Sequence, residues 1–70
     1  MPREAIIRKV NPYELHGVRY YQLFLSYVNE LDAVREVRIA HDVIYPDPQE
    51  GDEILVETVL NMVTGVQKKE

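Results

Sequence analysis

Cysteine is absent from the 70 residues, so the chain forms no disulfide and offers no thiolate to a zinc site. Tryptophan is also absent, and serine occurs only at position 26. No apolar run approaches the roughly 20 residues of a membrane-spanning helix, and the first residues lack the apolar core of a signal peptide. We therefore expect a cytoplasmic protein with no membrane partner, stabilised by its core or by a partner subunit.

Basic residues are outnumbered, with 8 Lys and Arg against 12 Asp and Glu and a net charge of -4. Such a surface does not attract phosphate backbones, so nucleic acid is not expected as a partner. The charge is also uneven: residues 1–40 carry six basic and five acidic groups, whereas residues 41–70 carry two basic and seven acidic groups. This asymmetry suits two copies that meet through complementary patches, or an acidic half that receives a basic partner; simple solubilising charge is the alternative.

The length allows one domain, residues 1–70, and no second one. A domain of about this size buries only about 60% of its unfolded surface, so many of the 32 hydrophobic residues stay partly exposed in a monomer. We therefore expect self-association, with a homodimer as the first expectation and another protein partner as the alternative.

Strands are favoured by composition, because valine and isoleucine number 15 against nine for alanine and leucine. Alternation along the chain places the strands; in the run from Val18 to Val28, for example, the odd positions from Tyr21 to Tyr27 are uniformly apolar and the even positions are mixed. Asn11-Pro12 is expected to end the first strand, and a loop is expected to follow over residues 13–17. Residues 46–52 are expected to be the longest loop, and Gly65 is expected to mark a bulge or a sharp barrel bend. The predicted strands are residues 4–10, 18–28, 33–40, 53–60 and 62–68.

A small helical bundle is the competing interpretation. Asn11-Pro12-Tyr13-Glu14 and Asp47-Pro48-Gln49-Glu50 both have the N-cap, proline and glutamate of a helix start. Gly17 and Gly51 would then fall within the first and second turns of those helices, which disfavours the bundle.

Five short strands with one long connection predict an all-β domain, a small partly open barrel of the SH3-like or OB-like type. The segment Glu50–Val56 resembles a turn-plus-strand element common in such barrels, and Val63-Thr64-Gly65-Val66 resembles a closing strand. This resemblance implies an architecture and no activity.

Catalytic and metal-binding patterns are weak. His41 precedes Asp42, but neighbouring residues in a strand point to opposite faces, and a hydrolase would also need a nucleophile beside His41. The acids from Asp42 to Glu57 do not have calcium-loop spacing, because Gly51 lies one position too early for a loop that begins at Asp47. We expect no enzyme, no catalytic residues, no metal site and no cofactor.

The aromatic residues of the second strand are the remaining candidates. Tyr20, Phe24 and Val28 lie on its mixed face, where a second subunit can cover them, and we predict this face as the self-association surface. Stacking of bases on Tyr20, Tyr21 and Phe24 is the alternative, as in an OB-like module that binds single-stranded nucleic acid. The sequence therefore predicts a small non-catalytic binding or assembly module.

Overall fold

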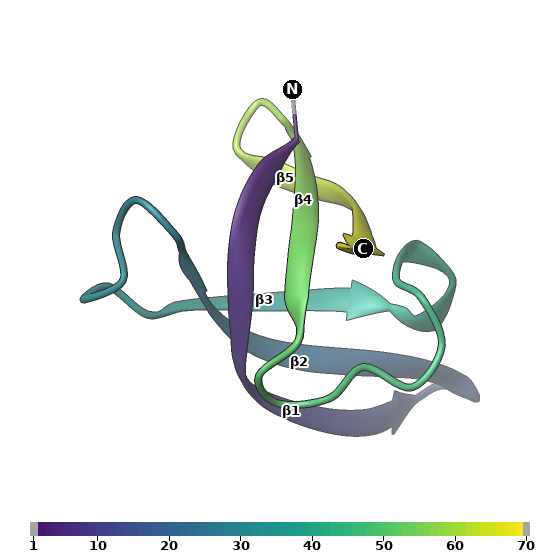
Figure 1. Cartoon of the computed structure of the whole chain (residues 1–70). Coiled ribbons are helices and arrows are strands. Elements are labelled where there is room, and N and C mark those ends of the chain that lie inside the picture. Colours follow the sequence, from purple (N-terminus) through teal and green to yellow (C-terminus); the bar gives the residue numbers. More distant parts are fainter. Residues whose placement is uncertain (1, 70) are drawn as a thin grey trace.

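The computed structural model describes residues 2–69 and is all-β, with a five-stranded antiparallel sheet (Figure 1). The only helical element in this part of the chain is one 3-10 turn, so the predicted all-β class is confirmed and the helical bundle is excluded. The elements are β1 (Arg3–Leu15), β2 (Val18–Tyr27), β3 (Arg35–Ala40), η1 (His41–Val43), β4 (Glu53–Val59) and β5 (Met62–Lys68).

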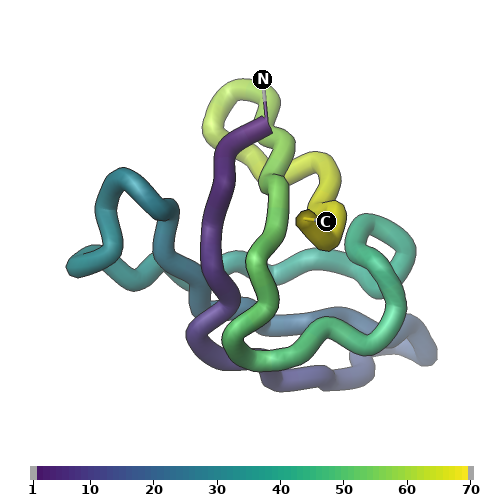
Figure 2. The backbone as a smooth tube through the Cα atoms, viewed as in Figure 1, coloured from purple at the N-terminus to yellow at the C-terminus, as the bar shows by residue number. Residues whose placement is uncertain are grey.

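The strand order in the sheet is β3-β2-β1-β4-β5. A single parallel bridge between Ile44 and Val66 links the segment after η1 to β5, so the two ends of the sheet approach one another without full pairing. The sheet therefore curls into a small, partly open barrel, and Figure 2 shows the chain returning upon itself in this way. A first strand flanked by the second and fourth is the connectivity of an OB-type Greek-key barrel.

β1 bends at a bulge. Ile7 pairs with Leu25 and Lys9 pairs with Phe24, which leaves Arg8 as the extra residue. Because side chains alternate along a strand, one extra residue moves the inward-facing set from odd to even positions. Ala5 and Ile7 therefore point into the core, and after the bulge Val10 takes the inward position opposite Leu23.

The core lies inside the curl of the sheet and contains aliphatic side chains from every strand. Leu23, Leu25 and Tyr27, three of the apolar odd positions of β2, are buried here, in agreement with the alternation of the sequence. Burial of these side chains provides the main stabilisation of so short a chain. The core residues are Ala5, Ile7, Leu23, Leu25, Tyr27, Ile39, Ile44, Ile54, Val56 and Val66.

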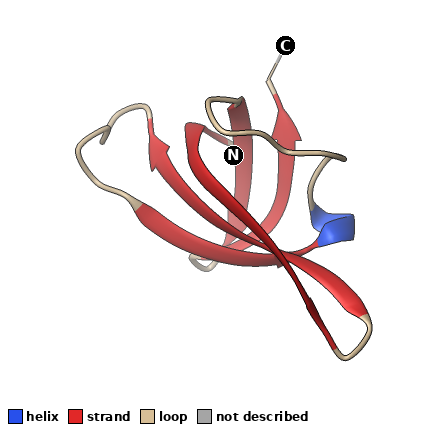
Figure 3. Ribbon diagram, turned by 90° about the horizontal axis from the view of Figure 1, so that it is seen from below, coloured by secondary structure: helices blue, strands red, loops and turns tan. Residues whose placement is uncertain are grey.

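The prediction that Asn11-Pro12 ends the first strand is wrong, and so is the loop expected over residues 13–17. β1 continues to Leu15, and Pro12 pairs with Tyr21. Proline is tolerated in a strand where its missing N–H faces away from a neighbouring strand, and this half of β1 has a neighbour on only one side. The β1–β2 hairpin therefore projects well beyond the rest of the sheet (Figure 3).

Two hairpins close through two-residue turns in which both residues have positive φ. His16 and Gly17 join β1 to β2 with φ of 53° and 78°, and Leu60 and Asn61 join β4 to β5 with φ of 51° and 67°. Such turns match the right-handed twist of the flanking strands. The predicted bulge near Gly65 is confirmed, because Glu57 pairs with Gly65 and Thr58 pairs with Val63.

The β2–β3 loop is held to the start of β1 by a charged cluster. The guanidinium carbon of Arg3 lies 3.8 Å from the centroid of the Tyr27 ring, and that of Arg35 lies 5.5 Å from it. Glu30 forms an ion pair of 3.6 Å with each arginine. Cation–π contacts of this kind stabilise by about 0.5–1 kcal/mol at exposed sites.

Candidate functional site

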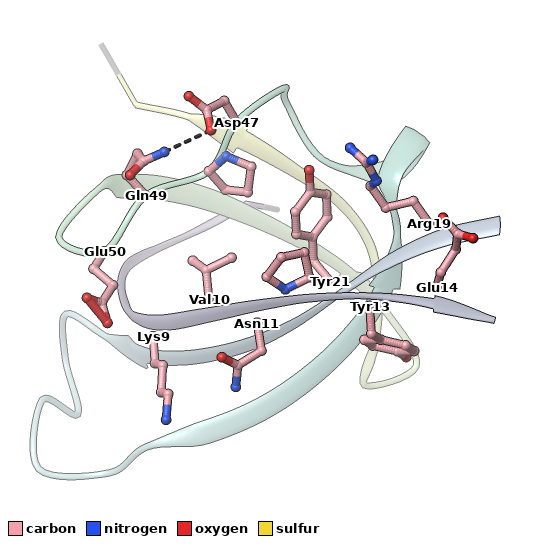
Figure 4. Close-up of a pocket in the computed structure, with 12 residues that line it drawn as sticks. Lys9, Val10, Asn11, Tyr13, Glu14, Arg19, Tyr21, Asp47, Gln49 and Glu50 are labelled. Carbon is pink, nitrogen blue, oxygen red and sulfur yellow. Dashed lines mark hydrogen bonds between the residues drawn. The ribbon is translucent and has the colours of Figure 1, made fainter. Parts of the chain in front are cut away.

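A hollow with a volume of about 820 Å³ follows the second half of β1. The β3–β4 connection, which includes Asp47–Glu50, forms the opposite wall (Figure 4). We call this hollow the β1 groove. Its lining residues are Lys9, Val10, Asn11, Pro12, Tyr13, Glu14, Arg19, Tyr21, Asp47, Pro48, Gln49 and Glu50.

The floor of the β1 groove is apolar. Val10 and Tyr21 project from the β1–β2 hairpin toward the facing loop (Figure 4). Pro12 also lines the groove, and Pro48 on the loop is buried. Tyr21 and Val10 also pack against the core, so this floor continues the hydrophobic interior to the surface. An apolar floor with a polar rim is the usual composition of a binding site.

The rim of the β1 groove is acidic. Glu14 lies at one end, and Asp47 and Glu50 lie on the loop. Within residues 2–69, none of these three carboxylates forms an ion pair with a lysine or arginine. Arg19 is the cation nearest to Glu14, its cross-strand partner, whereas Lys9 points to the other face of β1.

The loop wall is held in place by Tyr45 and Asp52. The Tyr45 hydroxyl donates a hydrogen bond of 2.6 Å to Oδ2 of Asp52. The backbone N–H of Gln49 donates one of 3.1 Å to the same oxygen. These donors hold the pKa of Asp52 below its usual value, and burial together with the carboxylate raises the pKa of Tyr45. Backbone bonds from Ile7 to Asp52 and from Gly51 to Ile7 dock the loop onto β1.

A smaller hollow continues the β1 groove toward η1 and contains His41. It shares Arg19, Tyr21 and Asp47 with the groove. No serine or threonine lines it, and Ser26 lies on the opposite face of β2 from Tyr21. The hydroxyl that this lining does carry is the phenol of Tyr21.

The acidic residues of the sequence are spread along the loop and β4. No group of three or more His, Asp or Glu side chains in residues 2–69 is placed to hold a metal ion. Asp52 instead accepts a hydrogen bond from Tyr45, and Asp47 accepts a hydrogen bond of 2.8 Å from the Gln49 side-chain amide.

No helix within residues 2–69 has the length and apolar character needed to cross a bilayer.

The predicted self-association residues lie on the outer face of β2, but they do not form one apolar patch. Tyr20 and Phe24 are half-buried, and Val28 is exposed beyond the end of the strand. Gln22 lies between the two rings and takes part in hydrogen bonds with Asn11 and Glu36. Polar side chains therefore separate Tyr20 from Phe24.

The residues considered for base stacking are divided between two faces. Tyr20 and Phe24 point outward, whereas Tyr21 lines the β1 groove. Tyr20 instead stacks on Tyr13, which the sequence did not single out, with ring centroids 5.5 Å apart and an interplanar angle of 17°. The three predicted rings thus cannot act as one stacking platform, although Tyr13 and Tyr20 form an aromatic pair on the outer face.

Comparison of the chain with protein families, with curated proteins and with solved structures gives no match. The site therefore rests on its own geometry. The sequence does not indicate its floor, because Asn11-Pro12 predicts the end of a strand at the point where β1 in fact continues. Glu14 directly opposite Arg19 across a short His-Gly turn was the signal for a longer hairpin.

Proposed function

We propose that this protein is a non-catalytic binding module that holds a segment of a protein partner in the β1 groove. The observation that carries this proposal is a hollow of about 820 Å³ whose apolar floor is bordered by carboxylates that form no ion pair within residues 2–69. A binding role needs only such a surface, whereas catalysis also needs reactive groups in contact with one another. Cytoplasmic location and homodimer formation stay predictions.

The proposal is tested by selecting ligands from a random peptide library with the purified chain. Tyr21→Ala removes a floor residue, and Tyr20→Ala is its matched control on the opposite face of the same strand. Selected peptides are expected to lose affinity at least about tenfold with Tyr21→Ala and to keep it with Tyr20→Ala, because a buried aromatic anchor contributes about 2 kcal/mol or more. Amide NMR spectra establish that both variants are folded.

Glu50→Arg provides a second groove variant on an exposed side chain, for the case in which Tyr21→Ala does not fold. Peptides that bind equally well to wild type and to the folded groove variants would overturn the proposal, and so would a library that yields no ligand.

Single-stranded nucleic acid is the second candidate, and the stacked Tyr13–Tyr20 pair favours it. Lys9 and Arg38 lie on the same outer face, but Arg38 is paired with Glu36 at 3.4 Å. Binding of labelled DNA or RNA that weakens steeply with salt would support this candidate if Tyr20→Ala removes it and Tyr21→Ala does not.

A further inference from the structure

The outer edge of β1 is unpaired along the β1 groove. β4 pairs with β1 only from Arg3 to Ile6, and the last backbone bonds on that side join Ile7 to Gly51 and Asp52. From Lys9 to Leu15, β1 has only β2 as a neighbour. A strand edge of this kind is a template on which another extended chain can pair.

The register of the hairpin identifies the backbone groups that face the groove. A two-residue turn closes on a hydrogen-bonded pair, here Leu15 and Val18, and bonded and non-bonded pairs then alternate along an antiparallel ladder. Leu15, Tyr13, Asn11 and Lys9 therefore direct their backbone groups toward β2. Val10 and Glu14 direct N–H and C=O groups away from β2, and Pro12 directs only a C=O.

The hollow itself follows this edge. All six consecutive residues from Lys9 to Glu14 line it, whereas a pocket over one face of a strand is lined by alternate residues. The loop Asp47–Glu50 forms the far wall (Figure 4). The space therefore has the form of a channel beside a strand, and an extended peptide is the shape that fills it.

The charges around the channel favour a basic occupant. Glu14, Asp47 and Glu50 border it without ion-pair partners among the described residues. Of the two cations that line it, Lys9 points to the other face of β1 and Arg19 lies on the side of the carboxylates (Figure 4). Carboxylates arranged along an interface attract a cationic partner and repel an anionic one.

A second copy of the chain fits this edge poorly. Antiparallel pairing of β1 with itself brings together two rims that carry the same carboxylates, Glu14 and Glu50. It also places Pro12, which has no N–H, in the new ladder of both copies. A basic patch of residues 1–40 that could face an acidic patch of a second copy is also weakened. Three of its cations form ion pairs with acids of the same chain, namely Arg3, Arg35 and Arg38.

We propose that the β1 groove takes a basic, extended protein segment, which adds to the free edge of β1 as a further strand. This inference rests on the proposed function and specifies its partner. Backbone hydrogen bonds to Val10, Pro12 and Glu14 provide affinity without sequence preference, and the apolar floor and the carboxylates select alternating apolar and basic side chains.

The test uses two labelled octapeptides, one alternating lysine and valine and one alternating glutamate and valine. Fluorescence anisotropy at low salt is expected to show at least about tenfold tighter binding of the lysine peptide. Glu50→Gln is expected to weaken that binding about threefold, and Glu30→Gln, in the β2–β3 loop outside the groove, is the matched control without effect.

Amide hydrogen exchange tests the strand addition directly. Val10 and Glu14 are expected to exchange at least about tenfold more slowly in the complex, whereas Lys9 and Asn11, already bonded to β2, stay unchanged. Pro12→Val supplies one more donor and is expected to tighten binding of the lysine peptide.

The outcomes separate this inference from the proposed function. Lysine-peptide binding that depends on Tyr21 but leaves exchange at Val10 and Glu14 unchanged overturns strand addition and retains the groove. Equal binding of both octapeptides overturns the basic partner. If neither octapeptide binds, the inference is overturned. The proposed function is then still tested separately by the library peptides and Tyr21→Ala.

Discussion

The Tyr45 hydroxyl donates a hydrogen bond of 2.6 Å to the Asp52 carboxylate across the loop that forms one wall of the β1 groove. The two residues lie at opposite ends of a segment that contains two prolines and a glycine and has no regular structure. The loop has no strand pairing to fix its position. This bond and the backbone hydrogen bonds of Gly51 and Asp52 with Ile7 fix it instead. The width of the groove depends on them.

We expect Tyr45→Phe to loosen this wall and to raise the pKa of Asp52 toward its usual value, because the largest cause of the lowered pKa is removed. A carboxyl group whose pKa is lowered in the folded state stabilises the fold above its unfolded pKa, and this contribution is lost as the pH falls through the folded pKa. The difference in Tm between wild type and Tyr45→Phe is therefore expected at pH 7 and should vanish in acid. A carboxyl NMR titration reports the pKa of Asp52.

Tyr13→Phe is the control for this change, because the Tyr13 hydroxyl is at the surface and its ring contact with Tyr20 is retained. A Tyr45→Phe variant whose Tm difference from wild type persists unchanged at low pH would show that the ring packing of Tyr45, rather than the bond to Asp52, fixes the loop.

Most of the fold was predictable from alternation, because the buried residues of β2, β3 and β4 include alternate apolar positions, such as Leu23 and Leu25 in β2 and Ile54 and Val56 in β4. β1 was not, because its bulge at Arg8 breaks the alternation: Ile7 and Val10 point inward although they are three residues apart. A bulge depends on the pairing of two strands, which local sequence does not specify.

The candidate site was less accessible to sequence reasoning than the fold. The acidic loop was recognised, but the groove forms only because Pro12 lies on the unpaired edge of β1 and the loop returns to that edge. Proline ends many strands and also protects free edges, and only the tertiary arrangement distinguishes these two roles.

The β4–β5 turn carries a specific strain at Leu60. This residue is 91% exposed and has a φ of 51°, a left-handed conformation that disfavours leucine by about 1–2 kcal/mol. We expect Leu60→Gly to raise the free energy of unfolding by about 1 kcal/mol, measured by urea denaturation. The same experiment on Gly17→Ala in the other two-residue turn is expected to lower it by a similar amount, since Gly17 has a φ of 78° and open space around it.

If Leu60→Gly instead destabilises the chain, the leucine side chain contributes more through contacts than its conformation costs. Such a result would indicate that Val59, Leu60 and Met62, which are exposed together at this turn, are covered by another molecule in solution. Repeating the measurement at several protein concentrations distinguishes such a contact from an effect within one chain.

Ser26 is fully buried, and its hydroxyl has no hydrogen-bond partner in the described part of the chain. A buried hydroxyl without a partner costs about 1–3 kcal/mol of desolvation. We therefore expect Ser26→Ala to leave stability unchanged or to raise it by up to about 1 kcal/mol. Ile54→Val, which removes one methylene from the fully buried core, is the contrast and is expected to lower stability by about 1 kcal/mol. A loss as large for Ser26→Ala as for Ile54→Val would mean that the hydroxyl is bonded.

Self-association through the outer face of β2 remains a prediction, and Phe24 is the residue that tests it. Phe24 is half-buried between its cross-strand partners Lys9 and Glu36, so a carboxylate at this position faces one cation and one anion and does not enter the core. In sedimentation equilibrium at high concentration, we expect the mass of the wild type to exceed the 8.2 kDa of the monomer. We expect Phe24→Glu to remain monomeric, with a far-ultraviolet circular dichroism spectrum unchanged from that of the wild type. Leu60→Glu, at the far hairpin turn, is the matched control. Dissociation by Leu60→Glu but not by Phe24→Glu would move the interface to the β4–β5 turn, and a mass near that of the monomer up to hundreds of micromolar would contradict self-association on either surface.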